Sequence, residues 1–237
     1  MENEAVIHAE DILKKLKQEA NPANLEGMSR YGINVEKRLG TTIPLLRKTA
    51  KELGKNHQLA LELWASGYAD ARILAAMVDE PALLTEQQME NWVRDFNSWD
   101  VCDQVCMNLF EKTPLAWKKL SEWSRREEEF VKRAAYALIA CLAWHDKRLP
   151  DKAFIDAFPI IRSGAVDDRN FVKKAVNWAL RNIGKRNPNL NQAALALAEE
   201  IQRMDSKAAK WIGSDAVREL KSEAVQKRLR TVKKTSK

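Results

Sequence analysis

Apolar and polar side chains follow each other along this chain with the period of an amphipathic α-helix, most clearly in FVKKAVNWALRNIGKRNP at residues 171–188. On a helical wheel, four apolar residues share one face of this segment: Val172, Val176, Ala179 and Ile183. A second row lies nearly opposite and holds three cations and a tryptophan: Lys174, Trp178, Arg181 and Lys185. The pattern therefore predicts a helix whose largest apolar side chain points away from the core.

The same pattern occurs earlier in the chain, which indicates an internal repeat. FVKRAAYALIACLAW opens 41 residues before the first segment (171 minus 130) and has its own apolar row: Val131, Ala135, Leu138 and Leu142. Repetition at this spacing is typical of helix pairs stacked into a solenoid, as in HEAT and armadillo proteins. Two earlier segments fit the rhythm more loosely. Together the four segments bring one polar residue each to an equivalent position, on an expected concave face: Arg72, Asp103, Arg133 and Lys174.

The rest of the chain also fits an all-α protein. Its 237 residues include only 8 glycines and 7 prolines, and no alternating run bounded by turn residues indicates a strand. Seven breaks have the spacing of ordinary helices with short connections: Asn21-Pro22, Gly40 to Pro44, Glu80-Pro81, Thr113-Pro114, Leu149-Pro150, Phe158-Pro159 and Asn187-Pro188. Because none of them is a long linker, we predict a single HEAT-like solenoid domain over residues 1–217.

Positive charge is concentrated in two parts of the sequence. The chain has a net charge of +7, and residues 218–237 hold 8 basic and 2 acidic residues, so the remainder is close to neutral. We expect residues 218–237 to form a basic C-terminal tail, either a flexible arm or a solubilising end. Residues 162–186 hold 7 basic and 2 acidic residues. Such local clustering favours a polyanionic partner, although a solvated helix face has the same composition.

The sequence offers no signal for a membrane or a metal. Its first ten residues, MENEAVIHAE, are acidic and lack an apolar signal core, and no stretch reaches transmembrane length. Cys102 and Cys106 lie one helical turn apart beside Val105 and Leu109, with no histidine near, so buried apolar residues are favoured over metal ligands. We expect a cytoplasmic protein, associated with the nucleoid when on DNA, without a cofactor, membrane contact or obligate protein partner.

A second unusual segment is FNSWDVCDQV at residues 96–105. Trp99 and Asp103 are four residues apart and therefore share one helix face, well off the apolar row that contains Val105. Taken singly, each has a structural explanation: the carboxylate could cap a helix or pair with Arg133, and Trp99 could fill a gap between repeats. Two off-core tryptophans, an aspartate and aligned cations at equivalent repeat positions favour a functional site instead.

Five segments, in order, resemble those of one protein family: MSRYG (28–32), SWDVCD (98–103), FVKRA (130–134), FVKKAVNWALR (171–181) and KRNP (185–188). The family is the AlkD-like DNA glycosylases, the HEAT-repeat DNA alkylation repair enzymes, and the resemblance extends from about Met28 to Arg218. It implies a solenoid with an open, concave, basic surface that binds duplex DNA. It also implies hydrolysis of the N-glycosidic bond of cationic purines alkylated at N3 or N7.

The resemblance also implies roles for individual residues. Asp103 matches the family's catalytic aspartate, and Trp99 and Trp178 match the two aromatic residues that flank the lesion nucleotide. Arg133 matches a basic residue that faces the DNA backbone, and Tyr31 an aromatic contact near the site. The repeat positions add three further expected DNA-binding residues: Arg72, Lys174 and Arg181. The chain departs from the family at Ser98, where some members have a second tryptophan, and in the basic segment after Arg218.

These residue types suit the expected reaction. Cleavage of a glycosidic bond passes through an oxocarbenium-like transition state, which a nearby carboxylate stabilises. Because an alkylated purine is already cationic, it leaves without a general acid, and each aromatic face adds about 0.5–2 kcal/mol of attraction to the cation. A lyase would need an activated lysine. Nothing in the sequence singles one out, so we expect a monofunctional glycosylase.

Two other functions fit the same scaffold. A HEAT-repeat protein could bind damaged or branched DNA without catalysis, but backbone binding alone needs no carboxylate on a basic face. A scaffold for protein–protein contacts is the commonest use of such solenoids. It predicts an apolar or mixed-charge groove, whereas the expected inner positions are mostly basic.

Overall fold

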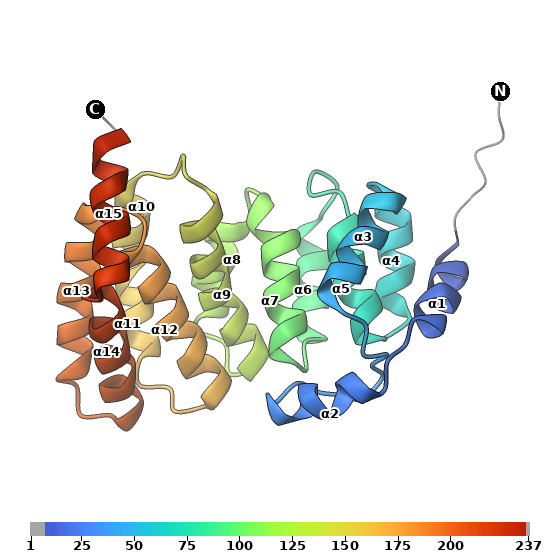
Figure 1. Ribbon diagram of the computed structural model, residues 1–237, viewed down its shortest axis with the longest axis horizontal. Coiled ribbons are helices and arrows are strands. Elements are labelled where there is room, and N and C mark those ends of the chain that lie inside the picture. Colours follow the sequence, from blue (N-terminus) through green and yellow to red (C-terminus); the bar gives the residue numbers. More distant parts are fainter. Residues whose placement is uncertain (1–7, 236–237) are drawn as a thin grey trace. The chain divides into compact units, whose positions relative to one another are not determined.

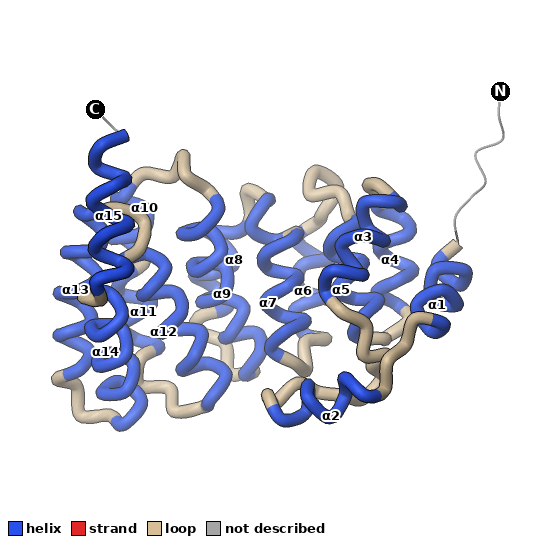
Figure 2. Tube along the Cα trace, viewed as in Figure 1, coloured by secondary structure: helices blue, strands red, loops and turns tan. Residues whose placement is uncertain are grey.

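Every regular element that the computed structural model describes, over residues 8–235, is a helix (Figures 1 and 2). The predicted all-α class is therefore confirmed for this part of the chain. The helices group into two compact units, one ending at Pro114 and the other beginning at Leu115. A single solenoid domain over residues 1–217, with a concave basic face, stays a prediction.

The first unit contains seven α-helices and one 3-10 helix among its described residues: α1 (Ala9–Gln18), α2 (Ala23–Arg30), α3 (Ile43–Leu53), α4 (His57–Ala65), α5 (Ala69–Val78), α6 (Glu86–Arg94), α7 (Trp99–Asn108) and η1 (Phe110–Lys112). Helix α5 lies at its centre and contacts α3, α4 and α7. Its sequence, ADARILAAMV, is rich in alanine, and eight of its ten residues are buried. Small side chains let neighbouring helices approach closely, so α5 forms the core against which α7 is positioned.

As far as residue 235, the second unit contains eight helices: α8 (Ala116–Trp123), α9 (Glu129–His145), α10 (Asp151–Asp156), α11 (Phe158–Gly164), α12 (Asn170–Gly184), α13 (Pro188–Gln202), α14 (Lys207–Leu220) and α15 (Glu223–Thr235). Helices α9 and α12 lie side by side, and α12 also contacts α13 and α14. Both apolar rows predicted for these two helices are buried, from Val131 to Leu142 in α9 and from Val172 to Ile183 in α12. The two helices are thus stacked through equivalent faces.

The repeat is visible at the start of these two helices. Phe130 and Phe171, the equivalent residues that open the two FVK segments, contact each other with ring centroids 5.5 Å apart. Prolines mark the breaks as predicted: Pro44, Pro159 and Pro188 occupy the first turns of α3, α11 and α13. There a proline loses no helical hydrogen bond, because the first backbone N–H groups have no partner within the helix.

The basic segment predicted as a tail is helical as far as the structure describes it. Its predicted start at residue 218 falls inside α14, and α15 follows after a short turn. Val225 and Leu229 of α15 are buried, and the helix contacts α13 and α14. Gln226 Nε2 donates a hydrogen bond to the carbonyl oxygen of Leu220 at 2.7 Å. This part of the segment is therefore a packed helix, and residues 236–237 lie outside the described residues.

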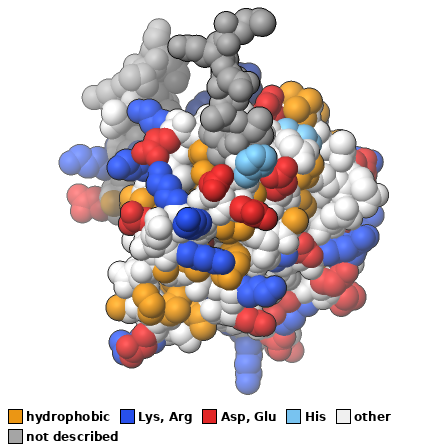
Figure 3. All heavy atoms as spheres, turned by 90° about the vertical axis from the view of Figure 1, so that its right-hand side faces the viewer, with side chains coloured by type: hydrophobic (Ala, Val, Ile, Leu, Met, Phe, Trp, Pro, Cys, Tyr) orange, Lys and Arg blue, Asp and Glu red, His pale blue; other side chains and the backbone are white. Residues whose placement is uncertain are grey.

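Surface charge is mixed on the face that Figure 3 shows, which is the right-hand side of Figure 1. Lys and Arg side chains are interspersed there with Asp and Glu side chains and with apolar patches. Positive charge is therefore not concentrated on this face. Within residues 8–235, no helix has both the length and the apolar character needed to span a membrane.

Candidate functional site

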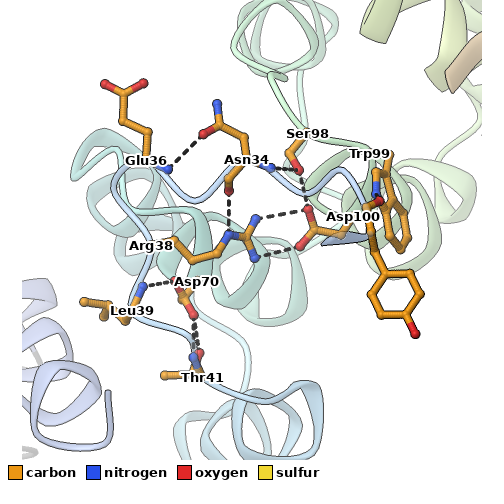
Figure 4. Close-up of polar contacts among 10 residues, drawn as sticks. Asn34, Glu36, Arg38, Leu39, Thr41, Asp70, Ser98, Trp99 and Asp100 are labelled. Carbon is orange, nitrogen blue, oxygen red and sulfur yellow. Dashed lines mark hydrogen bonds and ion pairs between the residues drawn. The ribbon is translucent and has the colours of Figure 1, made fainter. Parts of the chain in front are cut away.

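The predicted pair Trp99 and Asp103 lies on α7, and a buried ion pair fixes the start of this helix (Figure 4). Arg38 Nη1 and Nη2 donate to the two carboxylate oxygens of Asp100 at 2.7 and 3.0 Å. Only 2% of the Arg38 side chain and 13% of the Asp100 side chain are exposed. A bidentate contact of this kind fixes the relative orientation of the two side chains as well as the distance between them.

Ser98, the residue before α7, extends this network to the loop of residues 31–42. Its hydroxyl donates to Asp100 Oδ1 at 2.6 Å and accepts the backbone N–H of Asn34 at 3.1 Å. Arg38 Nε donates to the carbonyl oxygen of Asn34 at 2.9 Å. Ser98 is only 1% exposed, and a tryptophan at this position would lose both hydrogen bonds of the hydroxyl. The departure at Ser98 thus has a structural reason.

A second buried carboxylate holds the other end of the same loop. Asp70 of α5 is 1% exposed and accepts the backbone N–H groups of Leu39 and Thr41 at 2.7 and 2.9 Å (Figure 4). It also accepts the Thr41 hydroxyl. The 31–42 loop is therefore tied at one end to α5 and at the other to α7, which makes it a rigid part of the site.

Tyr31, at the start of this loop, lies beside Trp99. Trp99 Nε1 donates to the Tyr31 carbonyl oxygen at 3.0 Å, and Tyr31 is 78% exposed. Trp99 and Asp103 are both partly exposed, whereas Cys102 and Val105 on the neighbouring face of α7 are buried. The structure thus brings Tyr31 to Trp99 and keeps Trp99 and Asp103 off the core, as expected from the helical pattern. Their roles stay predictions.

In the second unit, Trp178 and Lys174 lie on the outer row of α12. Trp178 is partly exposed and Lys174 is exposed, while Val176 and Ala179 beside them are buried. The off-core position inferred for Trp178 is therefore confirmed. Among the described residues, Lys174 has no ion pair or hydrogen bond, which leaves its charge available for a ligand.

The structure corrects the expectation for Arg133. Only 5% of this residue is exposed, and its Nη1 donates to the Phe171 carbonyl oxygen at 2.6 Å. A phosphate contact requires an accessible guanidinium, so this arginine instead joins α9 to the start of α12. Helical periodicity identified its face but not the depth of its burial.

Two further cations of the predicted set are also occupied by protein contacts. Arg72 Nη2 donates to Asp95 Oδ2 at 3.0 Å, and its guanidinium lies 5.0 Å from the centroid of the Trp64 ring. Arg181 forms ion pairs with Glu219 and, at 3.6 Å, with Asp215. Their charge is largely compensated within the protein. Within the predicted row of cations, Lys174 is therefore the best placed to meet a phosphate.

Glu219 holds two cations of this unit together. Its carboxylate pairs with Arg181 and accepts a hydrogen bond from Lys185 Nζ at 2.7 Å. Burial alone would raise the pKa of Glu219, but the contacts with Lys185 and Arg181 outweigh it and hold the pKa below its usual value. The carboxylate therefore stays ionised and screens both cations.

A cavity of about 380 Å³ in the second unit contains residues that the sequence did not single out. Trp144, Lys147 and Arg228 line it together with Trp178. They come from the end of α9, the following loop and α15, so no single helical pattern connects them. The nearest signal was the basic, tryptophan-containing run WHDKR at 144–148.

Metal ligation finds no support in the described residues. Within residues 8–235, no group of three or more His, Cys, Asp or Glu side chains is arranged to hold a metal ion. Cys102, Cys106 and Cys141 are buried.

Comparisons with known proteins connect this geometry to a family. Residues 12–220 match a family model described as DNA alkylation repair enzyme. No curated protein sequence matches the chain. One solved structure is similar over 90% of this chain and 95% of its own, with a TM-score of 0.74 and 18% sequence identity. It is described as "a new family of proteins related to the HEAT-like repeat DNA glycosylases with affinity for branched DNA structures".

A designed armadillo repeat protein in complex with the peptide (KR)4 shares 14% identity over 91% of this chain and 95% of that chain. Its TM-score of 0.33 is too low to indicate a shared fold. The first likeness shows that the chain has the fold of the HEAT-like repeat DNA glycosylases, as the resemblance implied. Because the family model spans most of the sequence, this protein belongs to the DNA alkylation repair enzyme family.

Proposed function

We propose that this protein is a monofunctional DNA glycosylase that hydrolyses the N-glycosidic bond of cationic alkylated purines in duplex DNA. The proposal rests on one observation in a member of this family. Trp99 and Asp103 are both partly exposed, and they lie on a helix whose start is fixed by a buried ion pair. Duplex DNA containing N3- or N7-alkylated purines is the proposed substrate, and the reaction needs no cofactor.

Asp103 is the proposed catalytic carboxylate. As the bond to the base breaks, positive charge develops on the sugar, and a fixed carboxylate nearby stabilises that charge or aligns the attacking water. The alkylated base already carries a positive charge, so it departs as a neutral molecule without first being protonated. A single carboxylate therefore suffices for this substrate class.

Trp99 and Tyr31 are proposed to contact the nucleotide that carries the lesion, and Trp178 of the second unit is proposed to contact DNA. Aromatic faces attract cations through their negative quadrupole, by about 0.5–2 kcal/mol for each face, depending on desolvation. The hydrogen bond from Trp99 Nε1 to the 31–42 loop fixes the indole orientation before DNA binds. Such preorganisation avoids an ordering cost during the reaction and therefore favours catalysis. Lys174 is proposed to contact the DNA backbone.

The test is the release of free base from methylated duplex DNA under single-turnover conditions. We expect wild-type protein to release 3-methyladenine or 7-methylguanine above the rate in buffer. Asp103→Asn should keep affinity and fold but lower the rate by about 10²–10³, as loss of a well-placed electrostatic group commonly does. Asp205→Asn is the matched control, because the Asp205 side chain is fully exposed on the turn before α14.

The outcomes separate a catalytic role from a structural one. If Asp103 only supports the fold, Asp103→Asn should lower the melting temperature and leave the rate per folded molecule unchanged. A folded Asp103→Asn variant that excises at the wild-type rate would remove the catalytic assignment.

A second candidate function is binding of branched DNA without catalysis. The observation that favours it is the likeness to a structure whose protein is described as having affinity for branched DNA. This function predicts tighter binding to a three-way or four-way junction than to a duplex of equal length, and no release of base from methylated DNA. Both measurements can be made on the same preparation.

A further inference from the structure

The cavity of the second unit lies where the C-terminal ends of α9 and α12 meet α15. Its volume of about 380 Å³ is within the range of sites that enclose a small ligand, which begins at about 300 Å³. All the residues that line it belong to the second unit, so the cavity is defined by that unit alone.

Two tryptophans provide aromatic surface in this cavity. Trp144 is 51% exposed, an unusual position for the largest apolar side chain, and Trp178 is partly exposed. The Trp144 ring is stacked on His145, with centroids 4.9 Å apart and planes 20° apart, which restrains its orientation. Exposed, oriented indole faces stack nucleic-acid bases of any sequence, because every base has a π-face.

The same cavity contains cations whose charge is not neutralised. Lys147 and Arg228 have no carboxylate partner among residues 8–235. Arg186 donates to the carbonyl oxygens of residues 143, 146 and 149, and the nearby carboxylates of Asp151 and Asp146 offset part of its charge. Burial and the charges of Arg186 and Arg228 lower the pKa of Lys147. An anion bound here would relieve this repulsion. Arg181 and Lys185, also in the cavity wall, are already paired with Glu219.

We propose that this cavity binds one unpaired nucleotide of a DNA strand, with its base against Trp144 and Trp178 and its phosphate against Lys147 and Arg228. Within a duplex, both faces of a base are covered by its neighbours. Only a nucleotide in a tail, flap or gap therefore offers a free base face together with a phosphate. This inference depends on the proposed function only in taking DNA as the ligand. It adds a subsite for single-stranded DNA.

The first experiment uses small probes on the wild-type protein. Tryptophan fluorescence is followed while 2′-deoxyadenosine 5′-monophosphate, 2′-deoxyadenosine or inorganic phosphate is added. We expect the nucleotide to quench the fluorescence at lower concentrations than either of its parts, because it alone engages both the tryptophans and the cations. Equal quenching by the nucleoside and the nucleotide would contradict the role of Lys147 and Arg228.

The second experiment compares a blunt duplex with the same duplex carrying a five-nucleotide single-stranded tail at either its 5′ or its 3′ end. We expect a tail to tighten binding about tenfold, the order of one stacked base. Arg228→Ala and Trp144→Ala should abolish the gain. The matched controls, Arg230→Ala on the same helix and Trp211→Ala at a 42% exposed tryptophan, should retain it, because neither residue lines the cavity.

The two proposals fail differently. Equal binding of tailed and blunt duplexes by wild-type protein would overturn the nucleotide site, while excision from a blunt methylated duplex would still support the glycosylase. Tail-dependent binding without any excision would leave the nucleotide site standing and remove the glycosylase proposal. Thermal melts of Arg228→Ala and Trp144→Ala show whether a lost gain reflects the site or the fold.

Discussion

Lys174 and Arg133 occupy equivalent positions of successive repeats but have different surroundings. Lys174 is exposed, without an ion pair among the described residues, whereas Arg133 is buried against the Phe171 carbonyl. We predict that Lys174→Ala weakens binding to duplex DNA equally across sequences. The slope of log K against log salt should fall in magnitude by up to about 1, since one phosphate contact is lost.

Two variants make this prediction specific. Lys207→Ala, at an exposed lysine at the start of α14, should leave the salt slope unchanged if charge position rather than total charge matters. Arg133→Ala should chiefly lower the free energy of unfolding, because it removes the hydrogen bond that joins α9 to the start of α12. A slope that stays the same in Lys174→Ala would show that this row is only a solvated surface.

Signals within one segment predicted the positions of side chains, whereas contacts between distant segments could not be predicted. The spacing of Trp99 and Asp103, and the off-core position of Trp178, follow from helical geometry within one segment. The contact that fixes the start of α7 does not follow from one segment, because Arg38 and Asp100 are 62 residues apart in the chain. Nothing in the sequence of either segment specifies that contact.

At the scale of elements, the 31–42 loop depends on the buried ion pair between Arg38 and Asp100. We predict that Asp100→Ala lowers the free energy of unfolding by about 3 kcal/mol, because breaking a buried pair leaves an uncompensated charge on Arg38. Urea unfolding measures the loss. The double variant Arg38→Met with Asp100→Ala should recover part of it, since the stranded charge is then removed. An Asp100→Ala protein of wild-type stability would contradict the structural role of the pair.

Glu219 joins α14 to α12, and we predict that its titration makes the stability of the protein depend on pH. Its pKa is lowered in the folded protein, so its contribution is fully present above the unfolded value of 4.5 and is lost as the pH falls below that value. The stability difference between wild type and Glu219→Gln should therefore be constant near neutral pH and shrink in acid. Denaturant unfolding at several pH values measures it. The exposed-site variant Asp205→Asn should show no such convergence, and a Glu219→Gln difference independent of pH would contradict the prediction.

Helices and their boundaries were largely predictable because their signals lie within each element. The buried rows of α9 and α12 follow from the 3.6-residue period, and Asn187 before Pro188 marks the start of α13 by accepting the Leu190 N–H at 2.9 Å. The helical continuation through α15 was less evident, because its many cations resemble a solvated tail. Only two apolar residues, Val225 and Leu229, anchor its described part.

At the scale of the whole molecule, positive charge alone does not define the function. The net charge of +7 favours a polyanion, but several of the predicted cations are paired within the protein. Family membership indicates DNA as the partner more strongly than charge does. In the function that we propose, chemical selectivity comes from carboxylates and aromatic faces.

We expect the charge of a lesion to decide whether the whole protein releases it. Neutral bases such as uracil must be protonated, or stabilised as anions by hydrogen-bond donors, as they leave, whereas cationic alkylpurines leave as neutral molecules without a general acid. Asp100, the other carboxylate at the start of α7, uses both oxygens to accept hydrogen bonds from Arg38, so it is not available as that acid. We therefore expect release of 7-methylguanine or 3-methyladenine, but no release of uracil from an otherwise identical duplex, by mass spectrometry of the free bases. Uracil release at a comparable rate would show that a general acid or a hydrogen-bond donor acts on the leaving base and would contradict a mechanism that relies on the charge of the lesion.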